Sequence, residues 1–389
     1  MDTAGRWIGR GEALERLGVK TQTLYAYVSR GRIAARPDPA NPRRSLYAVQ
    51  DIARLSGGAS DDHEATEILP FEAPPSRGEA LIQSSLSVVA GGRLFYRGMD
   101  AVQLSQASTL EDTARLLWDA REANPFAGIA PRIDGVSGAS ARPRLFAALS
   151  RRAEEDPSSK GRTLADLKIE AAQVLTEVID AVAGTGPRMY FHQRLGRVWK
   201  VLERDNHLIR RALVLAADHE LDAAVLATRA AAGGGASPAG AAMAGLSALV
   251  TSPLAMDLSR TTAWVIEARR DPALAVRRRI ETGGTVPGFG TDGWPGGDPR
   301  AAALIEAADL PRDLVAVVRA GEAASGLAPD FGLALALVAR RLDLPREGAG
   351  DLLLLGRLAG LLGHALDQSL EGSPVAARLR YVGPRPGSH

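Results

Sequence analysis

The sequence predicts an all-α protein preceded by a small winged helix-turn-helix domain. Three observations support this prediction. After Leu110, apolar residues recur at spacings of three and four, the periodicity of helices that bury one face. Alternating, strand-like segments are scarce after residues 87–98. Residues 1–56 differ, because short helical patterns separated by turn residues are followed there by a basic hairpin.

The composition is that of a globular protein built from helices. The chain has 389 residues, enough for more than one domain. Cysteine is absent, which excludes a disulfide framework, a thiolate zinc site and a catalytic thiol. The amino terminus lacks an apolar core of signal-peptide type, and no uninterrupted apolar run reaches about 18 residues. We therefore expect a cytoplasmic protein without a membrane span.

Residues 1–56 are more basic than the chain as a whole. They contain ten Lys or Arg and five Asp or Glu, a balance of 10 − 5 = +5, whereas the entire chain carries +2. An apolar face predicts a first short helix, Thr21 can cap a second helix, and Gly31 can end it. Two extended segments over residues 33–47 and a third helix over 49–55 complete a winged helix-turn-helix pattern.

The stretch "ALERLGVKTQTLYAYVSRGRI", followed by "RRSLYAVQDIARL", resembles the excisionase/MerR-type DNA-binding domain. The resemblance implies that the second helix meets base edges while basic side chains neutralise phosphates. The residues expected to contact DNA are Lys20, Gln22, Thr23, Tyr25, Arg30, Arg32, Arg43 and Arg44. The alternative is a small helical docking or dimerisation module with a solvated basic face.

Residues 57–79 predict a linker, because they are rich in Gly, Pro, Ser and acids and lack helical periodicity. The segment is acidic, so folding back onto the basic domain is an alternative to a solvated spacer. The remaining chain, 80–389, predicts a large bundle of helices, with a short hairpin around Gly91 and Gly92. The predicted helical runs are 169–182, 207–217, 223–232, 239–250, 261–270, 314–320, 331–342 and 352–366.

Four polar segments interrupt these runs: "LAADHE" (215–220), "SPLAMD" (252–257), "GFGTDGWPGGDPRA" (288–301) and "APDF" (328–331). In this order, and with "GGRLFYRGMD" before them and "LGRLAGLLGHALDQ" after them, they resemble the active-site segments of the citrate synthase family. The resemblance covers about residues 80–389. It implies a helical dimer whose protomers have a large domain (about 80–255 and 343–389) and a small domain (about 256–342) that close over a cleft.

Members of this family are acyltransferases that condense acetyl-CoA with oxaloacetate. The reaction requires a base, a hydrogen-bond donor to the thioester oxygen, and cationic groups that bind the dicarboxylate. The resemblance places the base at Asp330 and substrate-binding groups at His219, Arg300 and Arg357. Each residue has an ordinary alternative. Asp330 can cap a helix, alone or in addition; His219 can be a structural hydrogen-bond partner; and either arginine can lie on the surface.

Other positions depart from the family pattern. The family's thioester-binding histidine falls on Ala255, which has no polar group, and its ketone-binding histidine falls on Thr291, which cannot carry positive charge. The next arginine position is Asp292, and an arginine of the closing tail falls on Ala376. Because losing one preorganised donor costs about 3 kcal/mol of transition-state stabilisation, we expect ligand binding to survive better than condensation.

The leading hypothesis is a regulator that senses a di- or tricarboxylate or a CoA thioester and binds DNA through residues 1–56. The main alternative is an active citrate or methylcitrate synthase of the tricarboxylic acid cycle, as a homodimer or completed by a related chain; a third is a non-catalytic structural subunit. We expect no covalently bound cofactor, and no metal site because the six histidines show no ligand spacing with acids. An imidazole of His192 or His364 reaching into the cleft would contradict the loss of chemistry.

Overall fold

The structure is a computed structural model that describes residues 7–52 and 82–372, together with residue 375. Within these ranges it does not describe residues 18, 20, 30–32, 39–40, 50, 133–134, 186–188, 292 and 295. The chain forms two compact units, Met1–Pro74 and Pro75–His389. The division lies inside the predicted linker, which is itself outside the described residues. The predicted domain boundaries therefore stay a prediction.

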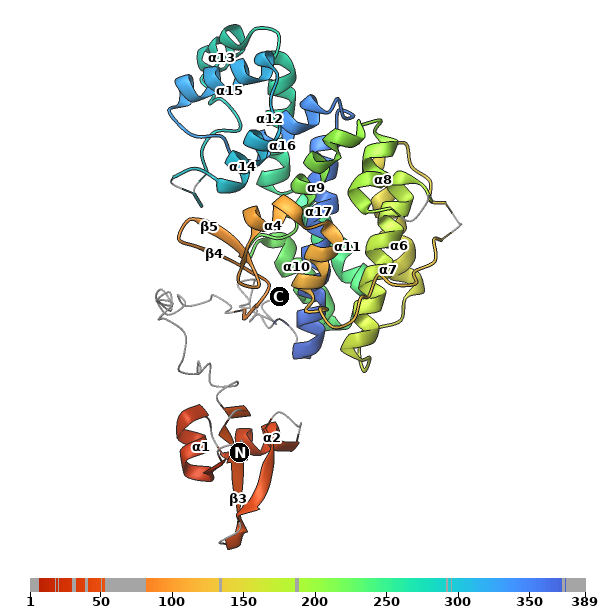
Figure 1. The fold of residues 1–389 in the computed structure, drawn as a ribbon, viewed down its shortest axis with the longest axis vertical. Helices are drawn as coiled ribbons and strands as arrows, with labels where there is room; N and C mark the ends of the chain where they lie inside the picture. Colours follow the sequence, from red (N-terminus) through yellow and green to blue (C-terminus); the bar gives the residue numbers. More distant parts are fainter. Residues whose placement is uncertain are drawn as a thin grey trace, which may run out of the picture. The chain divides into compact units, whose positions relative to one another are not determined.

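In its described part, the first unit combines short helices with a three-stranded antiparallel sheet (Figure 1). Its elements are β1 (Trp7–Gly9), α1 (Arg10–Leu17), α2 (Thr21–Ser29), β2 (Ala35–Asp38) and β3 (Asn41–Ala48). The strand order is β1-β3-β2, with Trp7 opposite Ala48 and Ala35 opposite Tyr47. Residues 49, 51 and 52 are helical, where the third helix was expected.

A small apolar core holds this unit together. Its buried residues come from every part of the unit: Ile8, Ala13, Leu24, Ile33, Tyr47 and Ile52. The first two predicted helices and the hairpin are confirmed. The third predicted helix, 49–55, lies partly outside the described residues, and the winged helix-turn-helix domain stays a prediction. Strand β1 was not predicted, because three residues are too few to show alternation and its partner β3 lies far along the chain.

The second unit begins with a small sheet of β4 (Ser87–Ala90), β5 (Arg93–Tyr96) and β6 (Met99–Asp100). The predicted hairpin is confirmed. Gly91 and Gly92 connect β4 to β5 with φ of 54° and 70°. Two successive positive φ values define the tight hairpin turn that twists with its strands, and glycine adopts them without steric cost.

The rest of the unit is helical, which confirms the predicted fold class (Figure 1). The helices are α4 (Ala101–Ala107), α5 (Leu110–Leu117), α6 (Ala141–Glu155), α7 (Leu164–Ala183), α8 (Phe191–Val198), α9 (Asn206–Leu215), α10 (Ala223–Gly234), α11 (Pro238–Val250), α12 (Pro253–Ala268), α13 (Pro272–Glu281), α14 (Pro299–Ala307), α15 (Arg312–Ser325), α16 (Phe331–Arg341) and α17 (Gly348–Glu371), with a 3-10 turn at Glu203–Asp205. Helix α12 begins earlier than the predicted run 261–270, because Ser252 caps it and Pro253 starts it.

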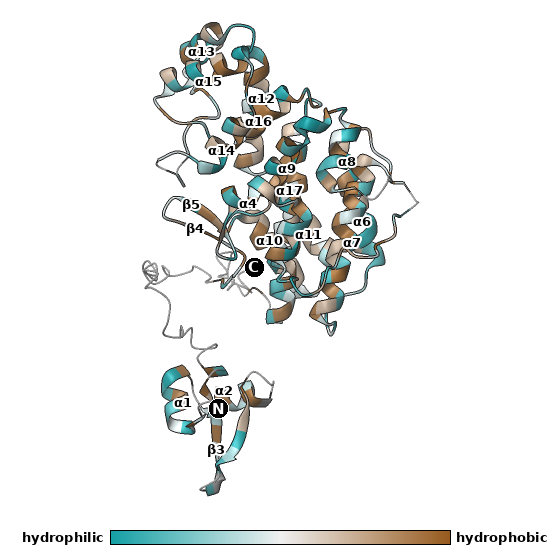
Figure 2. Cartoon of the chain, in the orientation of Figure 1, coloured by the Kyte–Doolittle hydropathy of each residue, from teal (hydrophilic) through white to brown (hydrophobic). Residues whose placement is uncertain are grey.

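Helix α17 is the centre of the second unit. It packs against α5, α7, α9, α10, α11, α12 and α16, and nearly all of its residues are buried. Its length and apolar composition would suit a membrane span, but 94% of its most apolar window is buried inside the protein. A helix that is apolar on most of its surface is expected in such a core. In Figure 2, α10 is mostly apolar, whereas α1 in the first unit is mostly hydrophilic.

A second hydrophobic cluster lies beside the main core. It joins α12, α13, α15 and α16 through Trp264, Ala275, Leu314 and Leu333, among others. All its buried residues fall between 264 and 337, inside the range predicted for a small domain. The main core also contains residues of that range, such as Leu304 and Ala339, and Ile305 and Leu310 pack against both clusters. The predicted boundary of a small domain therefore stays a prediction.

Candidate functional site

Two of the four polar segments lie side by side and build one wall of a cleft. The backbone N–H of Asp330 donates to the carbonyl of Gly288 at 2.9 Å, and that of Gly290 donates to the carbonyl of Ala328 at 2.9 Å. Gly288 has φ of 90°, and a Cβ there would lie 2.7 Å from Thr261 and 2.9 Å from Leu333. The glycines of "GFG" therefore serve close packing between segments.

The cleft has a volume of about 730 Å³ and lies between the amino end of α12, the segment before α14 and the amino end of α16. Its polar lining residues are Asp257, Thr291, Asp298, Arg300 and Asp330, and its aromatic ones are Phe289, Trp294 and Phe331. Two residues predicted from the sequence, Arg300 and Asp330, thus face one space. A cleft of this size can hold a small organic ligand.

Asp330 is both a helix cap and a carboxylate on the cleft. Its Oδ1 accepts a hydrogen bond of 2.7 Å from the backbone N–H of Leu333, so the capping alternative is confirmed. Burial raises the pKa of Asp330, and the negative charges of Asp298 and Asp257 raise it further. A carboxylate with a raised pKa is a stronger proton acceptor, which suits the predicted role of base.

Arg300 is buried and already paired. Its guanidinium makes a two-pronged ion pair with Asp298, with Nη2 at 2.6 Å and Nε at 3.0 Å from the carboxylate oxygens. It also stacks over Phe331 at 4.5 Å and Trp294 at 5.4 Å. With 7% of its surface exposed, Arg300 is not the surface arginine of the alternative reading. A bound carboxylate would share this guanidinium with Asp298.

His219 and Arg357 lie next to the cleft without lining it. The His219 ring meets Trp294 edge to face at 6.2 Å, and Trp294 lines the cleft. Arg357 is 3% exposed, which also excludes a surface arginine, and its Nη1 donates to the backbone carbonyl of His219 at 3.1 Å. Burial, then the positive charges of Arg300 and Arg357, lower the pKa of His219 to about 3. At neutral pH this imidazole is therefore an uncharged hydrogen-bonding group.

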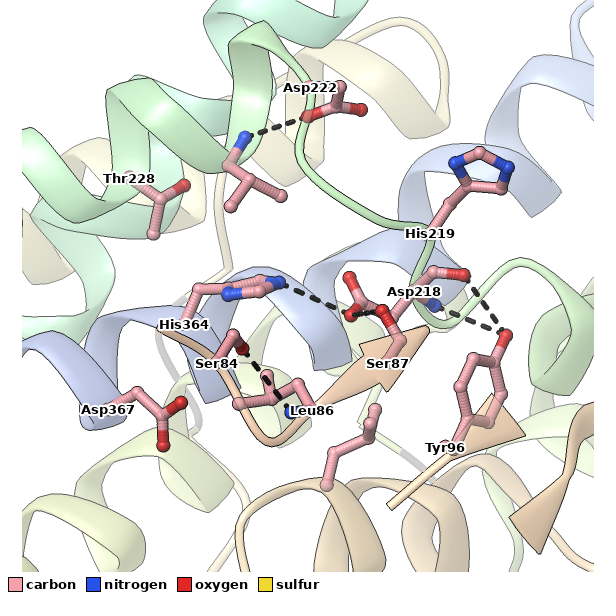
Figure 3. Close-up of polar contacts among 12 residues, drawn as sticks. Ser84, Leu86, Ser87, Tyr96, Asp218, His219, Asp222, Thr228, His364 and Asp367 are labelled. Carbon is pink, nitrogen blue, oxygen red and sulfur yellow. Dashed lines mark hydrogen bonds and ion pairs between the residues drawn. The ribbon is translucent and has the colours of Figure 1, made fainter. Parts of the chain in front are cut away.

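Asp218 anchors the segment that carries His219 (Figure 3). The Asp218 carboxylate accepts from the Ser87 hydroxyl at 2.7 Å and lies 3.2 Å from Nε2 of His364. Although burial alone would raise the pKa of Asp218, His364, Arg357 and Ser87 together hold it well below its usual range. In Figure 3 the His219 ring points away from this cluster.

The positions that depart from the family pattern are not equivalent. Thr291 lines the cleft, but Ala255 borders a different cavity, between α12 and α17. Asp292 and Ala376 lie outside the described residues. Neither His192 nor His364 lines the cleft: His364 is held between Asp218 and Arg229, and His192 stacks on Tyr190. Among the described residues, neither of these imidazoles therefore reaches into the cleft to replace the family's histidines.

Sequence reasoning missed Trp294, Asp298 and Asp257 as parts of the site. Asp298 could have been found, since an acid two residues before Arg300 at a helix start can cap the helix and pair with the arginine. Trp294 carried no such signal. Among the residues that the structure describes, no group of three or more His, Cys, Asp or Glu could hold a metal ion.

The candidate DNA-binding residues are described only in part. Lys20, Arg30 and Arg32 lie outside the described residues, and only the backbones of Gln22, Thr23 and Arg43 are described. Tyr25 is 49% exposed on α2, and Arg44 is exposed on β3. Two further arginines of this unit were not among the predicted DNA contacts. Arg10 donates to the Tyr25 hydroxyl at 3.4 Å, and Arg36 stacks on Trp7 at 4.4 Å.

The fold and cleft place the second unit in a class of large helical proteins built around a buried central helix. The model of the citrate synthase C-terminal domain family matches residues 139–379. This is more than half of the 389 residues, and the chain belongs to the citrate synthase family. Comparison with curated protein sequences finds no match.

Solved structures confirm the citrate synthase fold. Citrate synthase from Thermotoga maritima is 19% identical with a TM-score of 0.63, and the match covers 79% of this chain and 95% of that one. The ternary complex of carboxymethyl coenzyme A and oxaloacetate with citrate synthase from Thermoplasma acidophilum is 18% identical with a TM-score of 0.64. That match covers 79% of this chain and 95% of the other. Citrate synthase from Pyrobaculum aerophilum is 19% identical with a TM-score of 0.60, and the match covers 79% of this chain and 92% of the other. At these identities the likeness concerns the fold alone.

Proposed function

We propose that this chain is a ligand-sensing regulator, in which the second unit binds a di- or tricarboxylate or a CoA thioester and the first unit binds DNA. The observation that supports ligand binding is the cleft, where Asp330 and Arg300 face one space and position 291 carries threonine in place of an imidazole. Binding an anion needs fewer groups than stabilising an enolate, so recognition can outlast chemistry.

Three groups near the cleft suit a carboxylate. Arg300 presents a guanidinium beside it, and neutral His219 can donate a hydrogen bond. The Nε of Arg357 is buried and has no acceptor in the described part of the chain. An unpaired buried donor is costly. Because Arg357 does not line the cleft, a carboxylate reaches this atom only if the surrounding side chains move. That the Thermoplasma acidophilum enzyme was solved with carboxymethyl coenzyme A and oxaloacetate supports the choice of ligands to test.

The charge of the cleft limits the expected affinity. Its described lining holds Asp257, Asp298 and Asp330 against the single cation Arg300. A dicarboxylate therefore meets repulsion at neutral pH. We expect its affinity to rise as the pH falls and Asp330, whose pKa is raised by burial, gains a proton. Calorimetric titration of the full chain with citrate at pH 6 and pH 8 measures this directly.

The DNA half rests on charge and exposure. The first unit has the +5 balance within residues 1–56, and Arg36, Arg44 and Tyr25 are exposed on it. Fluorescence anisotropy of labelled duplex DNA over a salt series tests it on the full chain. We expect log K to fall linearly with log salt, with a slope about one smaller for Arg44→Ala. Arg204→Ala, an exposed arginine of the second unit, is the matched control.

The two halves are tested together by repeating the titration with citrate and with CoA. A shift of the DNA affinity by either ligand supports the regulator, because a ligand changes an equilibrium only through differential affinity for its states. DNA affinity that neither responds to salt nor changes with a ligand would remove the hypothesis.

An active citrate synthase is the second candidate, and Asp330 favours it, because a base with a raised pKa remains on the cleft. Release of CoA from acetyl-CoA and oxaloacetate measures turnover by the purified chain, alone and with a related chain. Robust turnover by the chain alone, lost in Asp330→Asn, would establish the synthase and contradict a site that only senses.

A further inference from the structure

A second cavity lies between α12 and α17, separate from the cleft. It has a volume of about 360 Å³ and is bordered by the end of α11, the first turns of α12 and α17, and Arg142 of α6. We call it the α12–α17 cavity. Its walls are mixed: Leu258, Leu353 and Leu354 form an apolar part, and these three side chains are at most 5% exposed.

One charged group of the cavity lining is buried. Asp351 is 5% exposed, and its carboxylate makes no hydrogen bond or ion pair with any residue that the structure describes. The other charged groups, Arg142, Arg346 and Glu347, are exposed around the cavity. The Asp351 oxygens are not among the fully buried atoms without a partner, so they are reached from the cavity. A donor bound in the cavity would compensate this carboxylate.

We propose that the α12–α17 cavity binds a small aliphatic amine, with its ammonium group on the Asp351 carboxylate and its hydrocarbon part against Leu258, Leu353 and Leu354. A primary ammonium offers three donors and a positive charge, which compensate a buried carboxylate. The volume suits a body of a few carbon atoms. Arg142 and Arg346 can in addition hold a carboxylate of the same ligand, as in an aliphatic amino acid.

The cavity and the cleft share the first turn of α12. Ala255 and Met256 border the cavity, whereas Leu254 and Asp257 border the cleft. An amine bound in the cavity would therefore contact the turn that shapes the cleft, as an effector. Binding is measured directly, so the inference does not rest on the proposed regulator function.

Isothermal titration calorimetry of the full chain tests the proposal with three compounds of one shape: 3-methylbutylamine, leucine and 4-methylpentanoate. We expect the amine to bind and the carboxylic acid not to bind; tighter binding of leucine than of the amine would show that the arginines contribute. Binding of 4-methylpentanoate alone, or of none of the three, overturns the proposal.

Two variants locate the site. Asp351→Asn keeps the shape of the side chain and should weaken the amine at least about tenfold, the usual scale for a charge-assisted contact. Ala263→Leu narrows the cavity while leaving Asp351 in place and should also weaken binding. Glu322→Gln, an exposed acid on α15, is the matched control. Equal binding by all three variants and the original chain refutes the assignment.

The pH dependence gives a further readout. Burial, then the nearby charge of Glu347, raises the pKa of Asp351 to about 7, against a lowering by Arg142. The ionised fraction of Asp351 then falls about tenfold from pH 8 to pH 6, while a primary alkylamine stays protonated. Amine affinity should fall by the same factor, and a pH-independent affinity contradicts the contact.

Discussion

Replacing Gly360 by alanine tests how the central helix holds the His219 segment. Gly360 lies inside α17, and its N–H donates to the carbonyl of Ala217 at 3.0 Å. A Cβ at this position would lie 2.3 Å from that carbonyl oxygen and 2.6 Å from Oδ1 of Asp218. Real Cβ contacts are not this short, so the Ala217–Asp218 backbone must move.

Two opposing terms set the magnitude. Alanine in a helix interior is favoured over glycine by about 1 kcal/mol. Overpacking a rigid interior costs about 1–3 kcal/mol, and the upper part of that range applies when backbone atoms must shift. We therefore expect Gly360→Ala to lower the free energy of unfolding of the second unit by about 1–2 kcal/mol.

Urea unfolding followed by tryptophan fluorescence measures this on the full chain, because four of the five tryptophans lie in the second unit. The matched control is Gly350→Ala in the same helix, where an added Cβ meets no atom within 4 Å. This control should be unchanged or stabilised by up to about 1 kcal/mol. Equal stability of the two variants would refute the reasoning that close approach demands glycine at 360.

Three further predictions concern the cleft. Asp330→Asn should leave stability within about 0.5 kcal/mol, because Asn caps helices as well as Asp does, yet lower any CoA release at least about 10²-fold. Thr291→His places an imidazole on the cleft and should raise any CoA release by about 10²–10³-fold, and an unchanged rate would mean that this position does not face the ketone. The pKa of His219 is lowered from 6.5 to about 3 in the folded chain. As the pH falls, the unfolded chain therefore gains a proton at His219 near pH 6.5, whereas the folded chain gains it only near pH 3. Stability should therefore fall as the pH drops from about 6.5 towards 3, and the urea midpoint of His219→Gln should fall less between pH 7 and pH 5.

Local patterns were enough to predict most long helices. Helices α7, α10, α11, α16 and α17 were found because their apolar residues repeat at helical spacing. Helix α13 was missed, and the structure shows why: Ala275 is its one buried residue among those described, so almost no apolar stripe exists to be read.

The site was predictable in part. The order of the motifs placed Asp330 and Arg300 on one cleft before any geometry was known, although their roles stay predictions. The pairing of Arg300 with Asp298, the position of Arg357 behind His219, and the cavity bordered by Ala255 were not readable. Each depends on which way a side chain points after packing.

The sequence by itself determined the helical class and the basic charge of the first unit, because these follow from residue type and local spacing. It predicted the family motifs and the positions where histidine is replaced. Only the tertiary structure decided which charges meet: Arg357 and His219 are 138 positions apart, and Asp218 and His364 are 146 apart. Such contacts are set by how α17 packs among its neighbours, and burial there determines whether an arginine, an imidazole or a carboxylate keeps its ordinary charge.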